Sequence, residues 1–560
     1  MVSRKQHPMN MRRAFYAVVI AGSTALGSVN AADQTRQKFY ADDPLWREPA
    51  PRPVRQVAVR KVDDIYDFLD NSYVTPGREG KAAKRAPRPA LDVNTLGEVP
   101  DNAWYTNRHA FKRMSIDELR RGPGNTTPPA PAGGWSIVGA KSDGITPGFI
   151  IEDQNKNRYL LKFDPPRYPE MCSAADVIGS KFFYALGYFT PENYVVHFHR
   201  EDLTIPAGAT WRDAGGRTHA LTKDAVDDML RPQPKASDGT YRALASKWVK
   251  GEIIGPFSYR GTRSDDPNDT VPHEDRRVLR GLRVFASWLN HQDTRAINSM
   301  DTLVTTDGRQ YIRHYLIDFG SILGSAGYSE KEPWMGHEYA IARPEAAKQM
   351  LTFGFYLPRW VRSDYPKITG VGLFDSWSFD AVNWKPNYPN PAFLMMDSED
   401  AFWAAKQVAA FTDDEIRAIV KTGELSDPRA ADWIANCLIE RRDKIAAAWF
   451  DKVLPLDRFR VADNTLTFDN LVTKQAAGSS GRYEVVWASY DNSTGASTKL
   501  SASRGKKLPL ADSSTTYLSA TITCGAASEG GCANPVKVYL RRTGASFEVV
   551  GVERRSDANR

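Results

Sequence analysis

The sequence predicts an α+β protein: a mainly β lobe, then a mainly helical lobe, then a C-terminal β-sandwich domain. Three observations carry this prediction. Residues 135–163 contain short runs rich in β-branched and aromatic residues, separated by polar turns. Residues 273–289 and 398–457 place apolar residues at helical spacing. From residue 460 onward, short β-type runs alternate with turns rich in Ser, Gly and Asn.

The N-terminal residues have the pattern of an export signal. Lys5, Arg12 and Arg13 precede an apolar run over residues 14–29, and small residues follow around Ala31. This order predicts a signal peptide over residues 1–31 and a periplasmic or secreted protein. The run is short for a membrane anchor, and no later segment is apolar enough to cross a bilayer. We therefore expect no transmembrane segment after cleavage.

The charge balance argues against a nucleic-acid partner. The chain of 560 residues has 74 Lys and Arg against 67 Asp and Glu, a net charge of +7. The whole excess lies within residues 1–90, and the remainder is balanced. The body of the protein thus carries no net basic field.

The four cysteines fit an exported protein. Cys524 and Cys532 flank a loop of Gly, Ser, Ala and Glu, so a local disulfide is predicted. Cys172 and Cys437 lie far apart in the sequence, and their pairing is left open.

Residues 32–134 form an N-terminal extension that is expected to pack on the domains C-terminal to it. It contains Pro- and Arg-rich segments and a short amphipathic helix near residues 62–73. A second helix is predicted to start at a capping box made by Ser115 and Glu118.

The first lobe is predicted over residues 135–254. Two strands flank the polar turn 154–157, and the second of them carries Lys162 among apolar residues. Leu160 and Lys162 share one face of this strand. A lysine there is either paired within a site or extends to solvent from an edge strand.

A helix follows over residues 173–188, closed by Gly187. Asp176 near its start has two interpretations. It pairs with Lys162, or it forms a capping box with Ser173. Glu170 is a second candidate for pairing with Lys162.

The second lobe, residues 255–458, holds the most informative stretch, residues 288–320. Two β-type runs surround the turn dipeptide Asp307-Gly308, which favours a two-residue hairpin loop. Such a loop pairs Thr306 with Arg309. It would then bring Asn298 opposite Ile317, beside Asp318.

Asp293, Asn298 and Asp318 supply what a phosphoryl-transfer site needs. An Asp and an Asn amide oxygen suit a hard cation such as Mg²⁺, and a second carboxylate can orient a hydroxyl. The alternative without a functional site is that Asp293 and Asn298 are loop caps and Asp318 is an Asx turn.

The spacing Asp-x₄-Asn followed by Asp318-Phe319-Gly320 resembles the protein-kinase-like superfamily. The similarity is greater to its atypical branches, the HipA-like, phosphoinositide-kinase-like and secreted Golgi-type kinases. The resemblance covers about residues 135–455. It implies ATP as donor, Mg²⁺ or Mn²⁺ as metal held by Asn298 and Asp318, and Asp293 as the residue that orients the acceptor.

The resemblance also assigns roles in the first lobe. Lys162 would contact the phosphates, and Asp176 would pair with it. Gly144 lies where a kinase has its phosphate-covering loop. The window from Val249 to Ile253, including Gly251, lies where a hinge would hold adenine by backbone groups.

The chain departs from the kinase pattern in places. Gln292 replaces the Arg of the H-R-D loop, so regulation by a phosphorylated activation loop is not expected. No A-P-E motif follows Asp318-Phe319-Gly320. The glycines of the first lobe do not spell the G-x-G-x-x-G motif.

Two further stretches have open interpretations. Glu274, Arg276, Arg277 and Arg280 either contact a phosphate or form a solvated face. Residues 353–397, dense in Trp, Tyr and Pro, either pack on the second lobe or form a wall that stacks a sugar or a lipid head group.

The sequence thus predicts an exported, atypical kinase-like protein that transfers a phosphoryl group to a protein, glycan or lipid acceptor. Residues 459–560 would be a β-sandwich accessory domain. Two alternatives stay open because an exported protein meets little ATP: a non-catalytic pseudokinase that binds a cell-envelope partner, and an AMP-transferring enzyme on the same fold.

Overall fold

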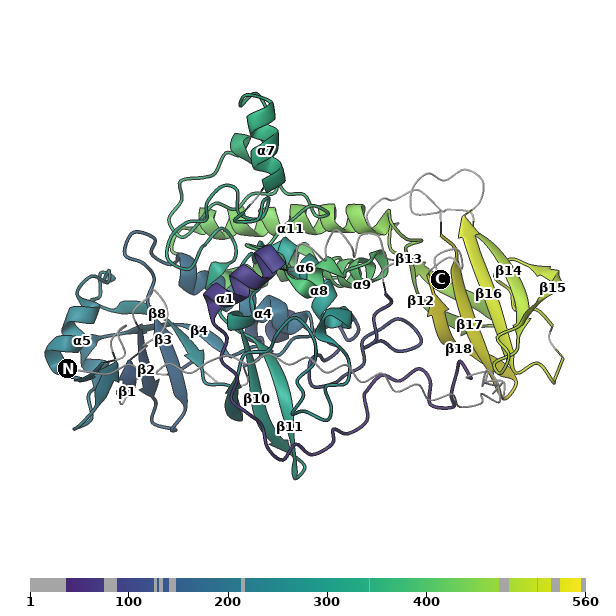
Figure 1. Cartoon of the computed structure of the whole chain (residues 1–560), viewed down its shortest axis with the longest axis horizontal. Coiled ribbons are helices and arrows are strands. Elements are labelled where there is room, and N and C mark those ends of the chain that lie inside the picture. Colours follow the sequence, from purple (N-terminus) through teal and green to yellow (C-terminus); the bar gives the residue numbers. More distant parts are fainter. Residues whose placement is uncertain are drawn as a thin grey trace, which may run out of the picture.

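Figure 1 shows two lobes and a C-terminal β module placed along the longest axis of the molecule. In the described part of the chain, no helix is long and apolar enough to cross a membrane. The predicted signal segment 1–31, Gly144 and Cys532 lie outside the described residues. The computed structural model describes residues 37–74, 88–124, 128–129, 134–140, 148–212, 217–341, 343–472, 483–510, 512–524 and 534–554.

The first lobe is built on a six-stranded sheet with the order β4-β8-β3-β2-β1-β5. Its strands pair antiparallel, except that β1 and β5 are parallel. Trp135, Leu161 and Phe198 belong to a buried core of this lobe. Since side chains alternate along a strand, Leu160 and Lys162 point to the opposite face from Leu161. The strands are β1 (Trp135–Ala140), β2 (Gly148–Glu152), β3 (Arg158–Lys162), β4 (Asn193–Phe198), β5 (Leu203–Thr204) and β8 (Tyr241–Lys247).

Helix α4 (Met171–Ala185) lies between β3 and β4 in the chain. It is followed by Gly187 at φ +108°, where a Cβ would lie 2.1 Å from the Tyr105 ring. Glycine therefore permits both the turn and the close approach. An insertion between β4 and β8 contains η2 (Arg200–Asp202), β5, the ribbon β6 (Thr210–Arg212) with β7 (Thr218–Ala220), and α5 (Lys223–Leu230).

The second lobe contains a three-stranded sheet in which β10 lies between β9 and β11. The pairing of β10 with β11 has the predicted register, with Thr306 opposite Arg309. The N–H of Ile317 donates to the carbonyl oxygen of Asn298 at 3.1 Å, so the hairpin extends to Asn298 as predicted. The strands are β9 (Glu252–Gly255), β10 (Ser299–Thr306) and β11 (Arg309–Leu316).

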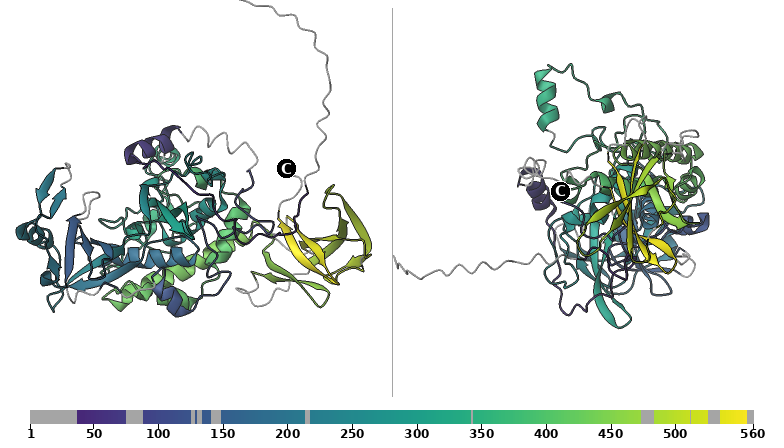
Figure 2. Two further views of the ribbon diagram at one scale, coloured as in Figure 1. Left: turned by 90° about the horizontal axis from the view of Figure 1, so that it is seen from below. Right: turned by 90° about the vertical axis from the view of Figure 1, so that its right-hand side faces the viewer.

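Helix α6 is the centre of the helical core, packed against α8, α9 and α11. Its predicted apolar stripe, Val278, Leu282, Phe285 and Leu289, is buried. Helix α7 stands away from the body in Figure 1 and in the right view of Figure 2. The helical elements are η3 (His273–Asp275), α6 (Arg277–Leu289), η4 (Ala296–Asn298), η5 (Phe319–Ser321), α7 (Arg343–Leu351), η6 (Arg359–Arg362), α8 (Pro391–Leu394), α9 (Ser398–Val408), α10 (Asp413–Lys421) and α11 (Pro428–Phe450).

The charged start of α6 is buried, which corrects both sequence interpretations of it. The Nε of Arg277 donates to Oδ1 of Asp400 at 2.9 Å, and Nη2 of Arg280 to Oδ1 of Asp275 at 2.7 Å. Arg277 and Arg280 are 4% and 0% exposed, so they form neither a solvated face nor a phosphate site. The sequence could not show this, because the acidic partner Asp400 lies far away in the chain.

The C-terminal module is entirely antiparallel in its described strands. A five-stranded sheet of order β15-β14-β16-β17-β18 and the ribbon of β12 and β13 share one apolar core, which includes Leu456, Leu466 and Trp487. The assignment of this module as a β-sandwich of immunoglobulin or fibronectin type stays a prediction. The strands are β12 (Leu456–Ala462), β13 (Thr465–Asn470), β14 (Tyr483–Tyr490), β15 (Ser497–Arg504), β16 (Tyr517–Cys524), β17 (Val536–Thr543) and β18 (Ser546–Glu553).

The cysteines divide into two kinds. Cys524 is disulfide-bonded. Cys172 and Cys437 are buried free thiols, so the pairing left open by the sequence is not made.

The N-terminal extension ties the β module to the second lobe. Phe39 is 1% exposed and packs among the rings of Tyr490, Tyr517 and Tyr539. From there the chain runs beside the hairpin of the second lobe (dark purple in Figure 1). The N–H of Val54 donates to the carbonyl oxygen of the hairpin residue Gln310 at 2.9 Å. The helical elements of this extension are α1 (Asp64–Leu69), η1 (Asp70–Val74) and α3 (Ile116–Arg121).

We expect Phe39→Ala to release the extension from the β module. Replacing a buried Phe by Ala costs about 3–5 kcal/mol. Limited proteolysis of the full chain should then cleave within residues 37–60 more than about tenfold faster, because each 1.4 kcal/mol is a factor of ten. The matched control is Tyr40→Ala, whose ring is 49% exposed. Equal cleavage rates for the two variants would show that the three tyrosines do not hold the segment.

Candidate active site

Five polar side chains that the sequence singled out line one cavity of about 560 Å³ between the two lobes. Lys162 and Asp176 come from the first lobe, and Asp293, Asn298 and Asp318 come from the second. Residues 248–251 connect β8 of the first sheet to β9 of the second. The five residues therefore converge on one cavity between the lobes.

Lys162 is held between two carboxylates. Its Nζ lies 2.8 Å from Oδ1 of Asp318 and 3.6 Å from Oδ2 of Asp176. Burial lowers the pKa of Lys162, but the charges of Asp176 and Asp318 outweigh burial and raise this pKa above its ordinary value. Strand β3 lies between β2 and β8, so Lys162 is not a lysine reaching solvent from an edge strand.

The structure decides between the two interpretations of Asp176. Helix α4 begins at Met171, and the Ser173 hydroxyl donates to Asp164 at 2.6 Å rather than joining Asp176 in a capping box. Oδ1 of Asp176 instead accepts the backbone N–H of Phe319 at 2.8 Å. Burial raises the pKa of Asp176 to about 6, against the opposing effect of the Lys162 charge. Glu170, the second candidate, accepts the N–H of Ser426 away from Lys162.

Asp318 is placed by an unusual backbone. Its φ and ψ are 60° and 65°, a left-handed conformation that non-glycine residues seldom adopt. The conformation turns the chain out of β11 and presents a carboxylate that is 50% exposed. Two residues on, a Cβ at Gly320 would lie 3.2 Å from Asp176 Oδ2, so glycine lets the Asp176 carboxylate lie close to the backbone of residue 320.

Asn298 and Asp293 are joined within their loop. The Nδ2 of Asn298 donates to the carbonyl oxygen and to Oδ2 of Asp293, both at 2.8 Å. The amide orientation is thereby fixed, and Oδ1 of Asn298 is turned away from Asp293. Asn298 is 8% exposed and lines the cavity.

These donors fit a metal-nucleotide rather than a metal bound by protein alone. Among the described residues, no group of three or more His, Cys, Asp and Glu is placed to hold a metal ion. Mg²⁺ in nucleotide sites uses one or two carboxylates together with phosphate oxygens and water. The Asp318 carboxylate and Oδ1 of Asn298 are oxygen donors of that kind in one cavity.

Arg295 and Asp64 belong to the site, although neither is among the residues that the sequence predicts for it. Arg295 forms an ion pair with Asp293, and its Nη1 lies 2.6 Å from Oδ2 of Asp64 in α1. Burial lowers the pKa of Arg295, but the charges of Asp293 and Asp64 raise it above its ordinary value. The position of Arg295, two residues after Asp293, is a weak signal in hindsight. Asp64 has no such signal, because it lies more than 200 residues earlier in the chain.

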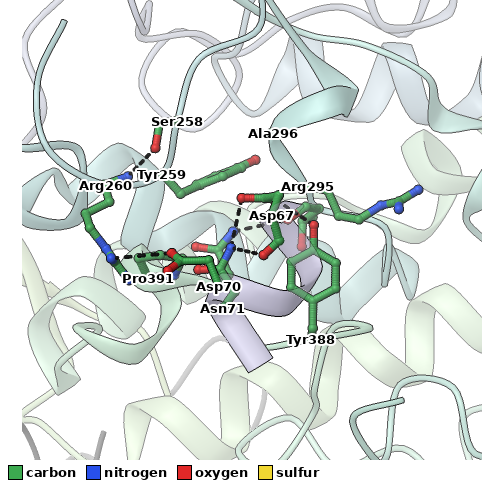
Figure 3. A pocket seen from close by; sticks show the side chains of 12 residues that line it. Asp67, Asp70, Asn71, Ser258, Tyr259, Arg260, Arg295, Ala296, Tyr388 and Pro391 are labelled. Atoms are coloured by element: carbon green, nitrogen blue, oxygen red, sulfur yellow. Dashed lines mark hydrogen bonds and ion pairs between the residues drawn. The ribbon is translucent and has the colours of Figure 1, made fainter. Parts of the chain in front are cut away.

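Arg295 also lines a second, smaller cavity of about 140 Å³, shown in Figure 3. The side chains of Asp67 and Tyr388 point toward one another there, and the Tyr388 hydroxyl donates to Oδ2 of Asp67 at 2.6 Å. The ring of Tyr259 lies on another wall. The N-terminal extension thus supplies one side of both cavities.

Part of the remaining wall of the large cavity is apolar, and Ser173, Ser246, Lys247 and Ser321 add polar groups to it. Leu160 and Leu244 come from the first lobe, and Met300 and Ile317 from the second. Of the predicted hinge window, Val249 and Ile253 line the cavity. Gly251 packs elsewhere, since its Cβ would lie 2.6 Å from the carbonyl oxygen of Leu303 in β10.

His291 is a buried packing residue at the start of the loop that carries Asp293. It is 4% exposed, and its ring lies 5.8 Å from that of Phe183 and 5.9 Å from that of Phe319, between centroids. Burial lowers the pKa of His291 to about 4. The imidazole is therefore neutral at pH 7 and packs Phe319 onto the helical core.

Similarity of this chain to known proteins is found among solved structures. No family model matches the chain, and no curated protein matches it. Among solved structures, the chain is similar to that of the Golgi casein kinase with Mn/ADP bound, at 10% identity and a TM-score of 0.27, over 72% of this chain and 94% of that one. A second structure of the Golgi casein kinase gives 10% identity and a TM-score of 0.26, over 70% and 94%. TM-scores this low do not establish a common fold.

The buried His291 should make the protein sensitive to acid. Its folded pKa lies below the ordinary value of 6.5, so its contribution is present above pH 6.5 and is lost as the pH falls toward 4. Between pH 7 and pH 5 this amounts to about 2 kcal/mol of the free energy of unfolding. Urea unfolding of wild type and His291→Asn at both pH values should show a fall that is smaller by that amount in the variant. His219→Asn, at an exposed position, serves as control and should fall like the wild type; an equal fall in all three proteins would contradict the assignment.

Proposed function

We propose that this protein is a metal- and nucleotide-dependent phosphotransferase with a kinase-like site. One observation carries the proposal: Lys162, Asp176, Asp293, Asn298 and Asp318 converge from two lobes on a single cavity that also has apolar surface. Structural ion pairs also gather charges, but they do not require an open cavity beside them. The volume of about 560 Å³ lies in the range of small-molecule sites.

In this proposal, the nucleotide base and the phosphates would occupy different parts of the cavity. Leu160 and Met300, on opposite lobes, offer apolar surface for a nucleotide base, and Val249 lies at the connection where backbone groups can contact it. Lys162 lies at the polar part, where its ammonium would neutralise phosphate charge. The ion pair with Asp176 holds that ammonium in place before any ligand arrives.

Asp318 and Asn298 would hold the metal. When bound, Mg²⁺ or Mn²⁺ would neutralise phosphate charge and orient the transferred group. The left-handed backbone at Asp318 keeps its carboxylate exposed to the cavity. The hydrogen bonds from Nδ2 of Asn298 to Asp293 keep Oδ1 available for the metal.

Asp293 would orient the acceptor. An acceptor hydroxyl oxygen would bond to the terminal phosphorus while the bond to the bridging oxygen breaks, and the nucleoside diphosphate would leave. The hydroxyl proton would pass to the Asp293 carboxylate, which Asn298 and Arg295 hold in a fixed direction. Most of the rate would come from positioning and from charge already in place.

Nucleotide binding tests this proposal directly. Mg-ATP at a hundred times Kd should stabilise the wild type by about 2.7 kcal/mol, seen as a rise in Tm. Asp318→Asn and Lys162→Met should lose the shift, because they remove a metal donor and the phosphate contact. Asp307→Asn, in the turn of the same hairpin, is the matched control and should keep it. The absence of any shift in the wild type with Mg²⁺ or Mn²⁺ would overturn the proposal in favour of a non-catalytic binding protein.

A second measurement separates the two transfer reactions. Wild type incubated with Mg-ATP and analysed by intact mass spectrometry should gain the mass of a phosphoryl group on itself or on an added acceptor. A gain of AMP would show that the nucleotide binds in the reverse direction. Asp293→Asn should keep the thermal shift and lose the transferred group, since Asp293 acts on the acceptor.

A further inference from the structure

A tip of exposed apolar side chains lies at the C-terminal end of helix α7 and in the turn after it. Met350 is 79% exposed, Leu351 81%, Phe353 90% and Phe355 91%. These are among the largest exposures of any apolar side chain in the described residues. Scattered apolar residues on a surface are ordinary, but a contiguous group at one tip marks a contact site.

The tip is an ordered turn. The N–H of Gly354 donates to the carbonyl oxygen of Gln349 at 2.9 Å, and the N–H of Phe355 to that of Thr352 at 2.9 Å. The Thr352 hydroxyl accepts the N–H of Tyr356 at 3.2 Å. These bonds end the helix and point the two phenylalanines outward.

The segment is fastened to the body at both ends. Glu345 in α7 lies 2.7 Å from the Nζ of Lys385, and the Trp360 indole N–H donates to Glu338 at 2.9 Å. Between these anchors the chain stands away from the second lobe in Figure 1 and in the right view of Figure 2. Other aromatic residues of the same stretch are different, because Phe374, Phe379 and Trp384 are buried.

Exposed basic side chains lie before and after the apolar tip in the chain. They are Lys348, Arg359, Arg362 and Lys367, and the Arg359 guanidinium lies 4.6 Å from the centroid of the Trp377 ring. The acids of the same stretch are Glu345, already paired with Lys385, and Asp364. The protruding segment is therefore apolar at its end and positively charged at its base.

We propose that residues 348–362 dock the protein on an anionic lipid bilayer. Leu351, Phe353 and Phe355 would enter the boundary between head groups and acyl chains, and Arg359 and Arg362 would contact lipid phosphates. A convex apolar tip with a basic base matches interfacial membrane binding, in which apolar burial and attraction to anionic lipids act together. A protein partner would instead offer a groove for the apolar tip, and it would supply no lipid phosphates for the arginines to contact.

Vesicle co-sedimentation of the full chain tests the proposal. The vesicles are phosphatidylcholine alone, or phosphatidylcholine with about one-third phosphatidylglycerol to supply negative surface charge. Wild type should bind the anionic vesicles, and Phe353→Ser with Phe355→Ser should lower the partition coefficient by about tenfold or more. The double variant Arg359→Glu with Arg362→Glu should weaken binding to the anionic vesicles and leave binding to the neutral vesicles unchanged. All four positions are exposed, so the variants should fold.

The matched control is Val59→Ser, an apolar residue that is 61% exposed elsewhere on the molecule. It should bind like the wild type, and added salt should weaken wild-type binding because exposed charges are screened. Three results would overturn the proposal: no binding of wild type to anionic vesicles, equal loss in Val59→Ser, or self-association through the tip in size-exclusion chromatography without lipid. Vesicle binding is measured without nucleotide. A failure of the protein to bind vesicles would therefore leave the phosphotransferase proposal unaffected.

Discussion

The contact of one ammonium with two carboxylates holds the candidate site together. Lys162 comes from a strand of the first lobe, Asp176 from helix α4 and Asp318 from the end of the hairpin in the second lobe. Bringing two acids close together is unfavourable unless a cation lies between them. The lysine removes that repulsion, and the N–H of Phe319 adds a hydrogen bond to Asp176. The ion pair of Lys162 with Asp318 thereby joins the first lobe to the second.

Charges placed elsewhere in the molecule join segments that are distant in the chain. Arg277 and Arg280 are buried, and both form ion pairs with Asp400, which fixes helix α9 on α6. Removing one partner of such a pair leaves a buried charge without compensation, so these contacts are specific about which segments meet. They also account for arginines that look like surface or ligand-binding residues in the sequence.

The N-terminal extension shows how much a segment with little regular structure can contribute. Phe39 docks it on the β module, its backbone joins the hairpin edge, and Asp64 reaches Arg295 beside Asp293. The extension therefore connects the C-terminal module to the wall of the cavity. The tip at Phe353 and Phe355 is the opposite case, because its order comes from its own turn and its apolar groups are exposed rather than packed on the lobe. That contrast is why we assign the tip to a surface outside the protein.

The sequence by itself determined the local elements and the chemistry they carry. The Asp307-Gly308 turn set the register of the hairpin, because a two-residue loop leaves one pairing. That register placed Asn298 beside Ile317, and alternation along β3 placed Lys162 with Leu160. Short-range rules of this kind depend only on neighbours in the chain.

Only the tertiary structure decided the long-range partners. It chose the pairing of Asp176 with Lys162 over a capping box, turned Arg277 and Arg280 inward toward acids, kept Gly251 away from the cavity and brought Asp64 to Arg295. These outcomes depend on which surfaces meet when the core closes, and a charged or glycine residue carries no mark of the partner that it will find.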